Sequence, residues 1–122
     1  MSNMDSTRRR FRSASGRATF AATDSADVVL TTVKDSTYTI FVEEISVVIK
    51  TDAAQTITFQ DTASTPIFIE KTDSSPGANT QYRWVFAGEG KACTEGKSFG
   101  MVFSAAGLAG HVQWTGHQRK TS

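Results

Sequence analysis

The sequence is poor in residues that cross-link a chain or interrupt its strands. Cys93 is its only cysteine, so an intrachain disulfide is excluded and the fold must depend on packing. There are only two prolines, and no apolar run approaches the roughly 18 residues that span a bilayer. The N-terminus is polar and basic, without the apolar stretch of a secretory signal. We therefore expect one domain that is not inserted in a membrane.

Charge is unevenly distributed along the 122 residues, although the net charge is only +1. Residues 1–17 contain five arginines and one aspartate, whereas the rest of the chain contains eight basic and eleven acidic residues. This split predicts an extended basic N-terminal arm over residues 1–16, ahead of a mildly acidic domain. The residues assigned to partner binding are Arg8, Arg9, Arg10, Phe11, Arg12 and Arg17.

The basic arm allows more than one kind of partner. A segment of this composition is disordered in isolation, so order in it would require something that holds it. Clustered arginines can neutralise phosphates, pair with carboxylates or line a protein interface. Phe11 favours the protein interface, because an aromatic anchor flanked by arginines is typical of interface hot spots. Nucleic acid is kept as an alternative partner.

The rest of the chain alternates apolar and polar residues with a period of two, which is typical of strands. Turns rich in Gly, Asp, Ser and Pro separate these runs, and no window shows a helical period. We predict an all-β fold, an antiparallel, jelly-roll-like β-sandwich of about eight strands over residues 17–116. Residues 117–122 are expected to form a polar C-terminal tail. The expected core consists of Val28, Leu30, Ile40, Val42, Ile45, Val47, Ile49, Ile57, Phe59, Ile67, Ile69, Trp84, Phe86, Phe99, Met101, Phe103, Val112 and Trp114.

Glu43 and Glu44 interrupt the alternation between Val42 and Ile45. The interruption indicates either one long bent strand with a bulge near Glu43, or two strands that meet at a corner. Adjacent residues of a regular strand point to opposite faces. The two carboxylates could therefore act as a pair only if a bulge intervenes.

No group of residues combines a nucleophile, a base and an orienting partner, so we expect no enzyme activity, no catalytic residue and no cofactor. His111 and His117 are the only histidines, and a zinc site needs three or four ligands, so no metal site is expected. Cys93 is expected to be a buried thiol.

Two further motifs are set aside. Gly96-Lys97-Ser98 resembles the end of a phosphate-binding loop, but that motif needs a glycine where Lys91 stands. The aromatic residues in Gln81–Phe86 share one face of a strand, which favours a core over an exposed base-stacking platform.

The order of strands and turns resembles that of small β-sandwich structural proteins of tailed bacteriophages, of the capsid decoration (cement) type. The resemblance spans residues 37–115 and leaves residues 1–17 outside. It is carried by the stretch Thr51–Phe59, the turn Ala63–Pro66, the aromatic strand Gln81–Phe86, the turn Thr94–Lys97 and the last strand Gly110–Trp114.

The resemblance implies a non-enzymatic virion protein on the capsid surface, made in the host cytoplasm. Its partners would be the major capsid protein or other virion structural proteins, and it would form a homo-oligomer, a dimer or a trimer. A tail, fibre or head–tail component is one alternative, and a nucleic-acid-binding β-barrel is another. A third is a carbohydrate-binding sandwich, which would need exposed aromatic residues.

Overall fold

The computed structural model describes residues 11–20, 28–50, 55–63, 69–73, 80–103 and 109–122. Within these ranges the chain consists of strands and their connections, without a helix, as the period-two pattern predicts. None of the described segments is a helix long and apolar enough to cross a membrane. The expected core residue Ile67 lies outside the described residues.

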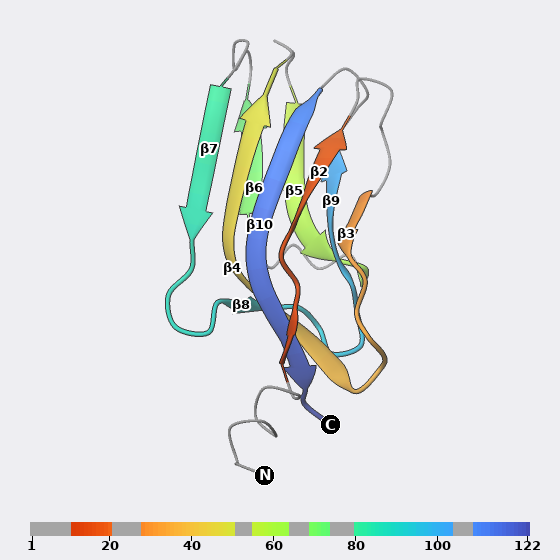
Figure 1. The fold of residues 1–122 in the computed structure, drawn as a ribbon. Helices are drawn as coiled ribbons and strands as arrows, with labels where there is room; N and C mark the ends of the chain where they lie inside the picture. The colour runs from red at the N-terminus through yellow and green to blue at the C-terminus, as the bar shows by residue number, and fades with distance from the viewer. Residues whose placement is uncertain (1–10, 21–27, 51–54, 64–68, 74–79, 104–108) are drawn as a thin grey trace.

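The strands form two sheets packed face to face (Figure 1). Sheet A has the order β1-β10-β4-β7, with β2 also paired to β10 and β8 also paired to β4. Sheet B has the order β3-β9-β5-β6. The strands of sheet A are β1 (Phe11–Ser13), β2 (Gly16–Phe20), β4 (Tyr38–Ile49), β7 (Thr80–Val85), β8 (Lys91–Ala92) and β10 (Gly110–Lys120). Those of sheet B are β3 (Val28–Thr31), β5 (Gln55–Asp61), β6 (Ile69–Asp73) and β9 (Phe99–Phe103).

The pairing is that of a jelly roll, as expected. Because β1 and β2 share one position beside β10, and β7 and β8 share one beside β4, sheet A has four strand positions. Counted this way, the first strand pairs with the last, the second with the seventh, the third with the sixth and the fourth with the fifth. All these pairs are antiparallel. The chain is therefore arranged like a long hairpin that has been rolled into two sheets.

The ends of the sandwich differ from the expected ranges. β1 lies within the expected arm, the expected boundary between residues 16 and 17 falls inside β2, and both strands pair with β10. β10 continues to Lys120, through most of the segment expected to be a polar tail. Gly116 permits this continuation, because its missing side chain leaves room for the Phe41 carbonyl of β4. Gly116, at which the sandwich was expected to end, is instead a point of close contact between β10 and β4.

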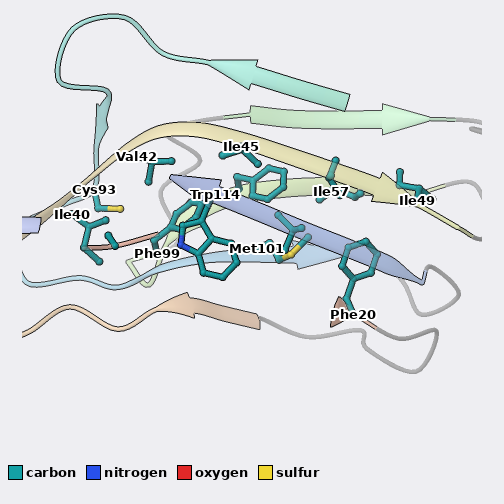
Figure 2. Close-up of a cluster of buried hydrophobic side chains, with 14 residues drawn as sticks. Phe20, Ile40, Val42, Ile45, Ile49, Ile57, Cys93, Phe99, Met101 and Trp114 are labelled. Atoms are coloured by element: carbon teal, nitrogen blue, oxygen red, sulfur yellow. The ribbon is translucent and has the colours of Figure 1, made fainter. Parts of the chain in front are cut away.

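The core fills the space between the sheets, and the side chains of Figure 2 point into it from both. Val42, Ile45 and Val47 of β4 face Phe59 and Phe99 of sheet B, and all five are fully buried. Most expected core residues with described side chains are buried or packed against this cluster. The cluster also contains three residues that the pattern did not place in the core list, namely Ala14, Phe20 and Cys93.

One bulge determines the face of every residue in β4. Thr115 pairs with Glu44 and Gly116 pairs with Val42, so Glu43 is the extra residue. The structure thus has one long strand with a bulge at Glu43, the first of the two expected alternatives. The bulge lets core residues resume at Ile45 after Val42, because it shifts the alternation by one residue.

We predict that Gly116→Ala destabilises the fold by about 1–3 kcal/mol, the usual range for overpacking a filled site. A Cβ at this position would lie 2.4 Å from the Phe41 carbonyl oxygen, and backbone cannot move aside as a flexible side chain can. The measurement is urea unfolding followed by circular dichroism. Thr115→Ala, at the neighbouring exposed position, is the control, and equal stability of the two variants would contradict the prediction.

Candidate interaction surface

The basic arm joins the sandwich at one edge of sheet A. Arg8, Arg9 and Arg10 lie outside the described residues. Phe11 and Arg12 belong to β1, where their backbones pair with Arg119 and Gln118 of β10. Arg17 lies in β2 opposite Gln113, and its side chain is exposed. The predicted partner-binding residues that the structure describes, Phe11, Arg12 and Arg17, therefore lie along a single edge.

The junction of β1 and β2 is fixed by hydrogen bonds to Gly116. The Ala14 amide donates to the Gly116 carbonyl (3.0 Å), and the Gly116 amide donates to Ser15 Oγ (3.1 Å). Ser15 Oγ also donates to the Gly116 carbonyl (3.3 Å). These bonds satisfy backbone groups where the ladder is interrupted, which buried backbone requires. They hold the start of the sandwich at the level of the β4 bulge.

The same edge is linked to sheet B. Trp114 Nε1 donates to Thr31 Oγ1 (2.8 Å), and Thr31 Oγ1 donates to the Ala14 carbonyl (3.0 Å). Trp114 is in β10, Thr31 is in β3, and Ala14 joins β1 to β2. This chain of two bonds closes one side of the sandwich. It also gives the indole N–H a partner in the core, as buried tryptophan needs.

The bulge places both carboxylates of the Glu43–Glu44 pair on the outer face of sheet A. Glu43 Oε1 lies 3.0 Å from Nδ1 of His117 on β10. Glu44 forms an ion pair with Arg83 on β7. Each carboxylate therefore connects β4 to a different neighbouring strand. Because both pairs are partly exposed, we expect each to contribute at most about 1 kcal/mol.

A group of side chains covers the outer face of sheet A at the end where β1 pairs with β10. We call it the arm-side cluster, and its members are Phe41, Glu43, Glu89, His117 and Arg119. The rings of Phe41 and His117 stack with centroids 5.1 Å apart, and the Arg119 guanidinium lies 4.5 Å from the Phe41 centroid. Arg119 Nη2 also donates to Glu89 Oε1 (2.8 Å). Phe41 is only 8% exposed although it points away from the core. The cluster is thus a preformed surface directly beside β1.

A shallow polar hollow of about 270 Å³ lies above the cluster on the same face. Its lining comes from three adjacent strands, and it offers both hydrogen-bond donors and acceptors around the Glu44–Arg83 pair. The lining residues are Glu44, Ser46, Gln81, Arg83, Gln113 and Thr115. This composition suits a polar partner surface better than an apolar ligand.

The aromatic residues that could stack on a sugar or a base face inward. Trp114 is 5% exposed in the core, and Tyr82 and Trp84 pack against the core cluster with their rings 6.0 Å apart. This arrangement agrees with the expected core face. Large exposed apolar side chains in the described ranges are Val29 and Val85, neither of which is aromatic.

In the described part of the fold, the remaining side chains that could bind a metal ion lie apart from one another. Across the described residues, no group of three or more His, Cys, Asp or Glu could hold a metal ion. Asp61 is buried, and its two oxygens accept the amides of Ala63 (2.9 Å) and Thr94 (2.8 Å). It therefore holds two turns together, in line with the usual role of a turn aspartate. At the C-terminus, hydrogen bonds from Ser122 and Thr121 lower the pKa of Glu95.

Known proteins resemble this chain in structure but not in sequence. No known protein family and no curated protein matches this sequence. Among solved structures, the chain is similar to the cryo-EM structure of the virus-like particle of the giant freshwater prawn Macrobrachium rosenbergii extra small virus. The identity is 9%, the TM-score is 0.43, and the match covers 88% of this chain and 78% of the other. That neighbour is a viral particle, and the relation to tailed phages stays a prediction.

We predict that Cys93 is almost inert towards Ellman's reagent in the folded protein. Burial, with a smaller effect of the Asp61 charge, raises the pKa of its thiol to about 12. The thiolate is the reactive species, so the native rate at pH 8 should be roughly 1,000-fold below the rate in guanidinium. Thr115→Cys, which adds an exposed thiol, is the positive control. Equal rates for the two thiols in the native protein would contradict the prediction.

Proposed function

We propose that this protein is a non-enzymatic structural component of a virion, with a jelly-roll domain and a basic arm that binds another virion protein. In its most specific form, the proposal is a capsid decoration protein of a tailed phage that binds the major capsid protein. The observation that carries it is the attachment of the arm: β1 begins directly after Arg8-Arg9-Arg10 and pairs with β10 beside the arm-side cluster. A partner held by the arm would therefore also meet a preformed surface.

Three features support a protein partner. The jelly roll is a recurring architecture of viral capsid proteins, although lectins and cupins share it. The arm-side cluster combines an aromatic ring with arginine and glutamate side chains that are already fixed by each other, which lowers the entropy cost of binding. The polar hollow next to it adds hydrogen-bonding groups of both kinds. Arm and face together can hold one partner at two points, which raises the effective affinity.

We expect the triple substitution Arg8→Gln, Arg9→Gln and Arg10→Gln to abolish most capsid binding while the sandwich stays folded. These residues precede the first described strand, and removing their charge removes the guanidinium contacts to partner carboxylates. The protein would be mixed with capsids built from the major capsid protein of the same genome, and the bound fraction measured on a sucrose gradient.

A charge-matched control separates the arm from net charge. Lys50, Lys91 and Lys97 are exposed in the domain, and changing all three to Gln removes the same charge. This control should bind like the unmodified protein. If the arm variant sediments with capsids as well as the control does, the arm is not the anchor. If the unmodified protein stays unbound, the decoration role fails.

Nucleic acid is the second candidate partner, and one observation favours it. The β1–β10 register sets Phe11 opposite Arg119 and Arg12 opposite Gln118, so the backbone of a basic segment pairs with the strand that carries Arg119 and the exposed Lys120. Basic residues of β1 and β10 thus belong to neighbouring strands at one end of sheet A. Such a concentration of positive charge attracts phosphate backbones.

This alternative predicts binding to labelled single-stranded DNA that weakens steeply with salt. Removing the three arginines at positions 8–10 should reduce the slope of log K against log salt by about 2, since each phosphate contact contributes roughly 0.7. The measurement is fluorescence anisotropy between about 50 and about 200 mM salt, the range in which such phosphate contacts dominate binding. A salt-independent signal, or an unchanged slope in the variant, would exclude this function.

A further inference from the structure

We propose that β7 is a self-association edge, through which two copies of the chain pair antiparallel about a two-fold axis centred on Tyr82. The two sheets A would then form one continuous sheet. This inference goes beyond the proposed function, because it requires no other virion component and rests on the fold of the isolated protein.

The two edges of sheet A differ. At the β2 edge, β2 contacts β3, and the Trp114–Thr31–Ala14 hydrogen bonds join the two sheets. At the other edge, β7 pairs with β4 from Thr80 to Val85, and within the described part of the chain it pairs with no further strand (Figure 1). Its outer side therefore presents backbone N–H and C=O groups, which can extend the sheet.

β7 lacks most of the devices that normally prevent edge pairing. Its sequence Thr80–Val85 contains no proline, glycine or lysine, and its register with β4 is regular throughout. By contrast, the edge strand β3 of sheet B has a register shift between Val29 and Thr31. The charge on β7 is that of Arg83, which is already paired with Glu44. Val85, at the end of β7, is 68% exposed, so an apolar side chain also stands at this edge.

Charge decides between the two registers that pair the most residues of β7, with the axis at Tyr82 or at Arg83. Residues directly opposite in an antiparallel pair lie on the same face, so the axis must pass through a residue position. An axis at Arg83 would place two like charges opposite each other, which is destabilising. An axis at Tyr82 places Gln81 opposite Arg83 of the second copy, twice by symmetry, and Tyr82 opposite itself. The Gln81 carbonyl can then accept a hydrogen bond from that guanidinium.

This register also joins the two polar hollows. Gln81 and Arg83 line the hollow at its β7 side, next to Glu44. With the axis at Tyr82, the same two residues of the second copy would adjoin them on the outer face. The dimer would therefore present one extended polar groove across both sheets A, with an acidic and a basic side chain from each copy.

The first experiment is sedimentation equilibrium of the full-length protein and two variants of opposite charge. We expect a concentration-dependent dimer that Gln81→Lys weakens by roughly ten-fold, because lysine would face Arg83 of the second copy, and that Gln81→Glu strengthens. Gln113→Lys is the matched control: it adds the same charge to the same hollow, but on a central strand, and should leave the dimer unchanged. Circular dichroism confirms that each variant is folded.

The second experiment tests the register by oxidative cross-linking. A mixture of Gln81→Cys and Arg83→Cys chains should form a disulfide-linked heterodimer, whereas Arg83→Cys alone should not cross-link to itself. A monomer at all concentrations, or a Gln81→Lys variant that dimerises as tightly as the unmodified chain, would overturn the proposal. Efficient cross-linking of Arg83→Cys alone would overturn the register. Because only this chain is present, none of these results depends on a virion partner.

Discussion

The close approach of β10 and β4 at Gly116 is the constraint on which the rest of sheet A depends. At this level Glu43 is the extra residue of β4, β1 gives way to β2, and the Gly116 backbone binds Ala14 and Ser15. The irregularities of neighbouring strands therefore coincide along one line across the sheet. A single bulge would bend one strand, whereas aligned interruptions let the whole sheet bend without leaving buried backbone groups unpaired.

This line divides the outer face of sheet A into two kinds of surface, and both lie over one continuous core. On the side of the line toward Gly110 of β10, the outer face is a polar hollow around the Glu44–Arg83 pair. On the side toward Lys120 of β10, Phe41 is covered by His117 and Arg119 in the arm-side cluster. The inward residues are unaffected, because the bulge restores the alternation at Ile45. One inserted residue thus produces two adjacent outer surfaces without a defect in the packing beneath them.

The sequence predicts what depends on local pattern. The alternation in β4 and β7 correctly separates core from outer residues, and the bulge at Glu43 is one of the two alternatives that the Glu43–Glu44 interruption left open. It does not predict the burial of Phe41, because the side chains that cover this ring come from β10, far away in the sequence. Phe20, buried in the core at the end of β2, is also missing from the expected core.

The candidate surface is harder to predict than the fold because it is built from three or four strands at once. The arginines of the arm are conspicuous in the sequence, but their neighbours are set by the β1–β10 register. Nothing near Glu43 in the sequence indicates that His117 lies beside it. The signal that could have found this contact is Gly116, since a glycine in an otherwise regular strand often marks a bulge or a close approach.

The two edges of sheet A can be occupied at the same time. β10 and β4 separate the β1/β2 edge from β7, and neighbouring strands lie about 4.8 Å apart, so the two edges are roughly 15 Å apart. The β1/β2 edge is tied to sheet B by Trp114 and Thr31, so tension on the arm is transmitted to both sheets. The β7 edge lies on the other side of the central strands. A chain held by its arm could therefore still pair with a second copy, and a two-fold pair would carry two arms, which strengthens attachment to a lattice that offers repeated sites.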